Sequence, residues 1–253
     1  MSILLIEDRK QGFFSCFNLI LRGITKLTDS NKQDFHVKWN NPLYQNDNDN
    51  LFNKYFWIQN HETQFFESRY SVFDLEYNKQ VSSKFSKLEN NDLLLQTLVK
   101  NNYFNNPIVK KCSSSCFKKL NCLGVHVRRT DHGYHGELLE YSEYFKKIDE
   151  NLNIYSCIFL ASDDLEVIIK FKTRYGNLLN VNENIIRVAG KIGIHNLNFK
   201  NKDKLVLDVM TDAFSLAFCN KILITQSNVS TYVKTINPDI EYEYIDKHIK
   251  YTM

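Results

Sequence analysis

The sequence carries almost no net charge and has no long apolar run. Its 32 basic and 29 acidic residues leave a formal charge of +3 over 253 residues. A charge this small argues against a nucleic-acid-binding protein that works by neutralising many phosphates. The apolar run near the amino terminus is followed at once by charged residues and is too short for a signal sequence or a membrane span. We therefore expect a cytoplasmic protein without a transmembrane segment, and we leave peripheral contact with a membrane open.

Glycine and proline are scarce, with 8 and 3 residues, and neither scarcity points to a function. The six cysteines lack the close pair-plus-pair spacing of a zinc site, so we interpret them as reduced thiols. His132, His135 and Glu137 also lack the spacing of a strong metal motif, and we expect no metal. With 43% apolar and 24% charged residues, the chain is typical of a globular protein with one large or two small domains.

A change in composition at 101–119 marks a candidate domain boundary. This segment contains Pro107, a serine run at 113–115 and four lysines. Such a mixture is typical of a solvated linker, and a basic patch for polyanions is the weaker interpretation. We therefore predict two halves, one at 1–115 and one at 116–253.

Apolar segments of strand length alternate with amphipathic helical segments, most regularly after this boundary. The predicted strands are 2–6, 35–39, 123–127, 155–161, 185–188 and 221–225. The predicted helices are 141–152, 163–175, 205–217 and one that starts at about Ser230. Asp163 with Glu166 is expected to cap a helix that Gly176 ends, and 11–15 is expected to be a turn. This order predicts the α/β class, with parallel sheets covered on both faces in two Rossmann-like halves.

The most informative segment is Gly-Val-His-Val-Arg-Arg-Thr-Asp at 124–131. An apolar strand that ends in charged residues places them at the carboxyl edge of a sheet, where open α/β folds bind ligands. Guanidinium groups suit a diphosphate because they are permanently charged and donate in a planar fork. Strand alternation puts His126 and Arg128 on one face and Arg129 on the other. We therefore expect one arginine to meet the ligand while its neighbour pairs internally, for instance with Asp131; a surface ion pair is the alternative.

This segment resembles the signature of the α1,6-fucosyltransferases and bacterial nodulation fucosyltransferases, relatives of the protein O-fucosyltransferases. Three further blocks resemble that family in the same order. Phe-Leu-Ala-Ser-Asp-Asp at 159–164 resembles its strand ending in Ala-Thr-Asp-Asp. The segment 204–225 resembles its aspartate-containing helix and following strand, with Asp208 opening the helix. The segment 12–18 resembles its glycine-containing turn beside the nucleotide. The resemblance is good over 120–240 and thin over most of the first half.

The resemblance implies a GT-B-like architecture, with the acceptor side in the first half and the donor site in the second. It implies an inverting, metal-independent glycosyltransferase that moves fucose from GDP-fucose to a glycan or glycoconjugate hydroxyl without a cofactor. Two alternatives stay open. One is a transferase for another GDP-deoxyhexose, such as rhamnose. The other is a non-catalytic nucleotide- or glycan-binding module on the same fold.

Matched residue by residue, the resemblance implies a set of donor contacts. Arg128 would hold the β-phosphate, with His126 beside the nucleotide, and Asp208 would accept hydrogen bonds from the guanine edge. Ser227 and the amides around Asn228 would contact phosphate at a helix start, where unpaired N–H groups favour anions. The other donor-site residues that the resemblance implies are Gly12, Phe13, Arg129 and Asp131.

Sugar transfer also benefits from a carboxylate that takes the acceptor proton, while Arg128 stabilises the leaving group. Glu137 lies within about one position of the family's acidic residue, so the resemblance implies that it is the catalytic base. A solvated loop glutamate is the alternative interpretation of Glu137, and Glu140 and Glu143 are weaker candidates for the base.

Two pairs of aspartates remain. Asp163-Asp164 resembles the metal-binding Asp-x-Asp motif of other transferases, but helix capping explains Asp163 more simply. Asp208 and Asp212 lie one helical turn apart on a polar face. Plain solvation accounts for such a pair, and only the family match singles out Asp208.

Overall fold

The computed structural model describes 2–6, 12–18, 20, 35–39, 41, 43–44, 51, 55, 121–131, 138–190, 192–237 and 239–246. The chain divides into two compact units, Met1–Asn106 and Pro107–Met253, which are described here one at a time. The predicted boundary near residue 115 lies outside the described residues and stays a prediction. None of the helices among the described residues is long and apolar enough to cross a membrane.

In the first unit, β1 (Ser2–Ile6) and β2 (Phe35–Trp39) form a parallel pair, as the apolar patterns at 2–6 and 35–39 predict. The expected turn at 11–15 is wrong in part, because 13–18 and 20 are helical. The Gly12 carbonyl accepts hydrogen bonds from the amides of Ser15 and Cys16, so the helix begins directly after this glycine.

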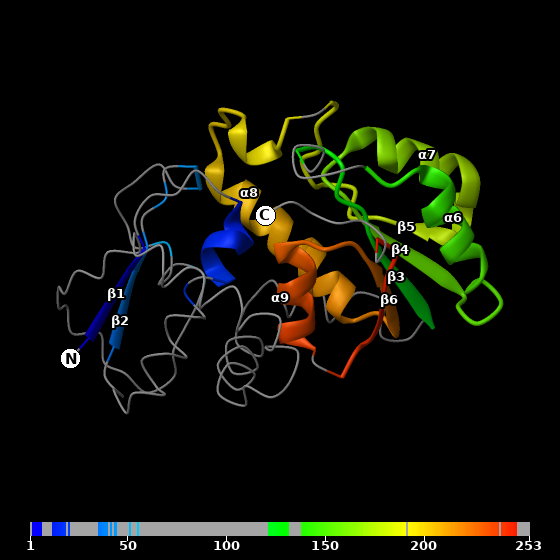
Figure 1. Ribbon diagram of the computed structural model, residues 1–253. Helices are drawn as coiled ribbons and strands as arrows, with labels where there is room; N and C mark the ends of the chain where they lie inside the picture. The colour runs from blue at the N-terminus through cyan, green and yellow to red at the C-terminus, as the bar shows by residue number, and fades with distance from the viewer. Residues whose placement is uncertain are drawn as a thin grey trace. The chain divides into compact units, whose positions relative to one another are not determined.

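The second unit is built on a five-stranded parallel sheet with the order β5-β4-β3-β6-β7 (Figure 1). Its strands are β3 (Cys122–His126), β4 (Cys157–Ala161), β5 (Leu179–Asn180), β6 (Lys221–Ile224) and β7 (Glu241–Tyr244). The chain runs outward from β3 to β5 and then returns to the other side of β3 to form β6. This is the strand order of a Rossmann-like fold, and ligands bind such sheets where the order reverses, between the carboxyl ends of β3 and β6.

In the described part of this unit, helices lie on both faces of the sheet (Figure 1). They are α6 (Tyr141–Asp149), α7 (Leu165–Tyr175), α8 (Lys202–Ala217) and α9 (Asn228–Ile236). Helices α6 and α7 bury the face that carries Leu123 and Val125, while α8 and α9 lie on the opposite face. Single-turn 3₁₀ helices at Gly176–Leu178 and Ile194–Asn196 complete the unit. The α/β class and the parallel sheet are therefore as predicted.

Two local predictions are wrong for physical reasons. The segment 185–188 is not a strand: Val188 forms only an isolated bridge with Asp164, and the third strand is β5. Asp163 does not cap α7, because the neighbouring Asp164 accepts the Glu166 amide at 2.8 Å. Gly176 does end α7, at a φ of 51° that favours glycine. Smaller differences are that α6 ends at Asp149 and that β7 was not expected.

Candidate functional site

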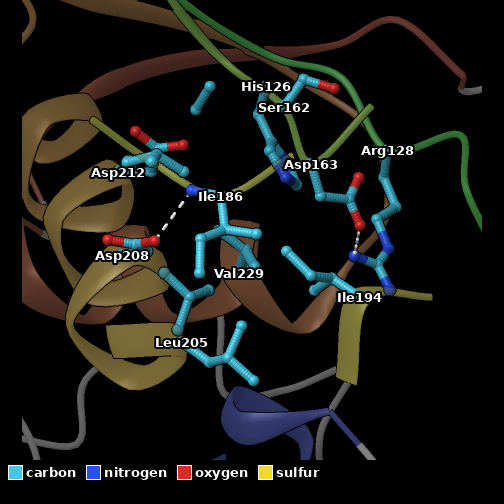
Figure 2. A pocket seen from close by; sticks show the side chains of 13 residues that line it. His126, Arg128, Ser162, Asp163, Ile186, Ile194, Leu205, Asp208, Asp212 and Val229 are labelled. Atoms are coloured by element: carbon cyan, nitrogen blue, oxygen red, sulfur yellow. Dashed lines mark hydrogen bonds and ion pairs between the residues drawn. The ribbon is translucent and has the colours of Figure 1, made fainter. Parts of the chain in front are cut away.

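The ends of two strands, β3 and β4, bound a pocket at the carboxyl edge of the second sheet. Figure 2 shows this pocket with His126 and Arg128 from the end of β3 and Asp163 from the end of β4. Helix α8 contributes Asp208 and Asp212, and α9 contributes Val229. The remaining wall is Ala161, Ser162, Ile185, Ile186, Ile194, Leu205 and Val209. The pocket thus lies at the reversal of strand order, with apolar walls and a few charged side chains.

His126 joins the end of β3 to the start of α9. Its side chain is buried, with 4% exposure, and its Nδ1 lies 3.0 Å from Ser230 Oγ. The single hydroxyl proton of Ser230 is donated to the Thr225 carbonyl at 2.8 Å. His126 Nδ1 is therefore the donor toward Ser230, an assignment made from the hydrogen-bond network. This contact fixes the ring plane of His126 at the pocket edge.

Arg128 lines the pocket and is held by two carboxylates. Its guanidinium forms ion pairs with Asp131 and Asp163, and its side chain keeps 20% exposure. Thr130 Oγ1 donates to the same oxygen of Asp163, Oδ2, at 2.7 Å. The other oxygen, Oδ1, is buried and has no hydrogen-bond partner among the described residues. Asp163, expected only as a helix cap, is therefore part of this site.

Arg129 points away from the pocket, as strand alternation predicts. Its guanidinium donates to the Leu139 carbonyl and lies 4.3 Å from the centroid of the Tyr141 ring. The suggested pairing of Arg129 with Asp131 is wrong, because Asp131 binds Arg128 instead. The main chain turns after β3, and this turn brings Asp131, three residues after Arg128, back to the side of the sheet on which Arg128 lies.

The start of α9 offers the pocket a helix N-terminus. Ser227 is the N-cap, and its Oγ accepts the Ser230 amide at 3.0 Å. Asn228 is the first helical residue and is exposed. Amides of a first helical turn carry partial positive charge and favour anions. Ser227 and Asn228 thus lie at a helix start, with Ser227 Oγ 3.4 Å from His126 Nδ1, and their contact with phosphate stays a prediction.

The opposite side of the pocket is acidic. Asp208 Oδ2 accepts the Ile186 amide at 2.8 Å, and Lys204 Nζ pairs with Asp208 at 2.8 Å. Asp208 lies in the second turn of α8 and not at its opening, because α8 begins at Lys202. Figure 2 shows Asp208 and Asp212 together on one side of the pocket and Arg128 on the other. Arg128 with its two carboxylate partners and the Asp208–Asp212 pair therefore lie on opposite sides of the pocket.

Asp212 is not a solvated residue. Only 8% of it is exposed, and its Oδ1 accepts from Asn182 Nδ2 at 2.7 Å. Burial raises its pKa to about 7. The sequence has no local signal for this burial, because the side chain that contacts the Asp212 carboxyl is Asn182, 30 positions away. Asn182 had no distinguishing signal, because only the fold brings it to α8.

Of the three acidic candidates for a catalytic base, the structure describes Glu140 and Glu143. Glu137 is outside the described residues, so its role stays a prediction. Glu140 is the N-cap residue of α6 without a side-chain capping bond, and Glu143 is exposed in the first turn of α6. Neither Glu140 nor Glu143 is among the described residues that line the pocket.

Gly12 and Phe13 belong to the first unit, and their contact with a donor stays a prediction. The Phe13 side chain is buried in an aromatic cluster, with its ring centroid 5.0 Å from that of Trp39. The Phe13 amide donates to Tyr44 Oη at 2.8 Å. The bulky ring therefore stabilises the helix start of this unit. In the described part of both units, no group of three histidine, cysteine or acidic residues is arranged to hold a metal ion.

The fold and the pocket define an α/β protein with a Rossmann-like sheet and a charged ligand pocket at its switch point. The chain shares its fold with solved structures of NodZ fucosyltransferases. A selenomethionine structure of NodZ from Bradyrhizobium is 11% identical, with a TM-score of 0.58 over 94% of this chain and 92% of that one. A second Bradyrhizobium NodZ structure is 10% identical, with a TM-score of 0.54 over 98% and 97%.

A third structure is the NodZ α-1,6-fucosyltransferase co-crystallised with GDP. It is 11% identical, with a TM-score of 0.50 over 94% of this chain and 92% of that one. At these identities the likeness establishes the fold, so the predicted resemblance is confirmed at that level. No protein-family model matches the chain, and no curated protein matches it significantly.

Proposed function

We propose that this protein is a glycosyltransferase that moves fucose, or a related deoxyhexose, from a GDP-sugar to a hydroxyl of a glycan. The observation that carries the proposal is the pocket at the strand-order reversal, with Arg128 on one side and Asp208 on the other. A nucleoside diphosphate has the matching polarity, with an anionic diphosphate and a base that presents N–H donors. The fold shared with NodZ, which has been co-crystallised with GDP, supports the same assignment.

The chemistry proposed for the pocket uses Arg128 in place of a metal ion. Departure of a nucleoside diphosphate leaves negative charge on the β-phosphate, which a forked cation and a helix N-terminus stabilise. Arg128 and the start of α9 at Ser227 supply these two groups. We assign inversion of the anomeric centre and the base role of Glu137 on the family resemblance. No cofactor is proposed.

We further propose a GT-B-like architecture, in which the first unit is a second Rossmann-like half and binds the acceptor. The parallel pair β1–β2 and the helical segment that follows Gly12 support this assignment, as does the near full-length match to NodZ. The four described cysteines, Cys16, Cys122, Cys157 and Cys219, are free thiols, which agrees with a reducing compartment such as the cytoplasm.

The test is a panel of GDP- and UDP-sugars offered to the purified protein, with hydrolysis and transfer to glycan acceptors as the measured products. We expect turnover of GDP-fucose or a related GDP-deoxyhexose, and none of the UDP-sugars. Binding of GDP-sugars without turnover, in the presence of varied acceptors, would favour the non-catalytic binding module. Turnover confined to UDP-sugars would reject the proposed donor class.

A further inference from the structure

Asp212 is a buried acid on the pocket side of α8, one helical turn after Asp208 (Figure 2). Both carboxyl groups line the same side of the pocket. Asp208 accepts a hydrogen bond from the Ile186 amide and pairs with Lys204. Asp212 has no cation within ion-pair distance among the described residues. The two neighbouring acids thus have different partners.

The partner of Asp212 determines which of its oxygens is available to a ligand. Asn182 Nδ2 is a donor, so the Asp212 oxygen that it contacts, Oδ1, is an acceptor. Asn182 is itself held in place by two contacts. Its side-chain Nδ2 lies 3.3 Å from Ser215 Oγ, and its main-chain carbonyl accepts a hydrogen bond from Arg187 Nη2. A proton on Asp212 therefore resides on Oδ2, which has no hydrogen-bond partner among the described residues.

The groups around Asp212 act on its pKa in both directions. Burial raises its pKa to about 7, and the carboxylates of Asp208 and Asp163 act in the same direction. The hydrogen bond from Asn182 and the charge of Arg187 act in the opposite direction. Both the donor form and the acceptor form of this side chain are therefore accessible to the folded protein.

We propose that Asp212 is a proton-dependent specificity residue. Its protonated carboxyl donates a hydrogen bond to a carbonyl oxygen of the bound nucleobase, while the neighbouring Asp208 accepts hydrogen bonds from the same nucleobase. The inference rests on the proposed function, in which a guanine nucleotide occupies this pocket. Guanine presents N–H donors next to the O6 acceptor on one edge, and so matches Asp208 as an acceptor beside a protonated Asp212. Ionised Asp212 would place a second acceptor against O6 and weaken binding.

The experiment is isothermal calorimetry of GDP binding to the full chain between pH 5.5 and 8.5, with Asp212→Asn as the matched variant. Asparagine keeps the acceptor for Asn182 and a permanent donor for the ligand. Comparing the two proteins at each pH cancels the titration of GDP itself, whose terminal phosphate has a pKa near 6. We expect similar affinities at pH 5.5 and about tenfold tighter binding by Asp212→Asn at pH 8.

A second calorimetric measurement gives the number of protons taken up when GDP binds. At pH 7.5, wild-type binding measured in buffers of different ionisation enthalpy should show net uptake of protons relative to Asp212→Asn. A purely structural role for Asp212 would produce no such difference. Asp212→Leu, checked for folding by circular dichroism, should bind GDP weakly at every pH because it has no donor.

The outcomes separate the two proposals. GDP binding with the same pH profile and the same proton uptake in wild type and Asp212→Asn overturns the role of Asp212, while the proposed function stands. Absence of GDP binding by the wild type at every pH overturns the proposed function and this inference together.

Discussion

Arg128 and Asp163 form an ion pair although they are 35 positions apart in the sequence. The pair exists because β3 and β4 are parallel neighbours, so that their carboxyl ends lie at the same edge of the sheet. Asp131 binds the same guanidinium, and the two carboxylates hold the planar fork at the pocket. Arg128 is thus oriented before any ligand arrives, and this preorganisation increases the value of a charge-stabilising group.

The first prediction concerns Arg128→Lys. Lysine keeps the charge but cannot form the planar fork that meets two carboxylates and a phosphate, so the change should not be conservative. Loss of one charge-stabilising donor typically lowers turnover about 10²–10³-fold, or about 3–4 kcal/mol in the barrier. Turnover of a GDP-deoxyhexose and the melting temperature measure the effect. The variant should remain folded.

Arg129→Lys is the matched control for this substitution. Arg129 contacts the Leu139 carbonyl and the Tyr141 ring, so its replacement should lower the melting temperature and leave turnover of the folded protein near that of the wild type. Near-normal turnover of Arg128→Lys beside a folded but inactive Arg129→Lys would exchange the roles of the two arginines.

The second prediction concerns the nucleobase that the pocket recognises. If Asp208 reads guanine, GDP should bind more tightly than UDP or ADP in calorimetry, and Asp208→Ala should remove that preference. Asp208→Asn is the control for stability, since its side-chain oxygen still accepts the Ile186 amide. Equal affinity of the wild type for all three nucleotides would reject this role for Asp208.

The third prediction is that turnover does not depend on a divalent metal. Arg128 brings a permanently charged, forked donor to the pocket, which can stabilise a leaving diphosphate in place of a metal ion. Extensive dialysis against a chelator should therefore leave turnover unchanged. A large loss that magnesium or manganese restores would indicate a metal-dependent class of transferase.

The sequence predicted the elements whose boundaries depend on local patterns. Strand β3 was placed within one residue because a continuous apolar run lies between polar segments, and strand alternation separated Arg128 from Arg129 correctly. The capping rule identified the start of α7 but not the residue, because Asp163 and Asp164 both fit it locally. Only the distant guanidinium of Arg128 decides between them, and no pattern at 163–166 contains that information.

Long-range contacts also explain what was missed at 185–188. The apolar pattern there is that of a strand, yet the Asp208 side chain binds the Ile186 amide and takes a backbone donor that a strand would use. The burial of Asp212 has the same origin, since it depends on Asn182, 30 positions away. The acidic side of the pocket was therefore visible in the sequence only as two aspartates on one helix.

The fourth prediction concerns the close packing of β3 against the sheet's α8 face at Gly124. A Cβ added at Gly124 would lie 2.8 Å from Ile222 Cγ2 and 3.0 Å from Cys219 Sγ. Gly124→Ala should therefore cost about 1–3 kcal/mol in the free energy of unfolding, measured with urea. In an Ile222→Ala background the nearest atom is gone, so the same change should cost less. Equal costs in both backgrounds would show that this contact is not the cause.

The last prediction is a pH dependence of stability that Asp212 contributes. Its pKa is raised to about 7 in the folded protein, above the ordinary value of an unfolded aspartate near 4. Between these values the folded state binds the proton more strongly than the unfolded state, so stability falls as the pH rises through this window. A shift of this size corresponds to a loss on the order of 3 kcal/mol by pH 8.

Urea unfolding of wild type and Asp212→Asn at pH 5 and pH 8 measures this contribution as a difference. Asparagine resembles the protonated acid, so the advantage of the variant over the wild type in the free energy of unfolding should be small at pH 5 and should grow up to pH 8. Asp239→Asn is the control, because it removes an exposed acid before β7 instead of a buried one. Its free energy of unfolding should match that of the wild type at both pH values. If the stability difference between wild type and Asp212→Asn is the same at pH 5 and pH 8, then Asp212 does not titrate in this range. The carboxyl group would then be ionised in the pocket throughout, with its charge balanced by Arg187 and the Asn182 amide.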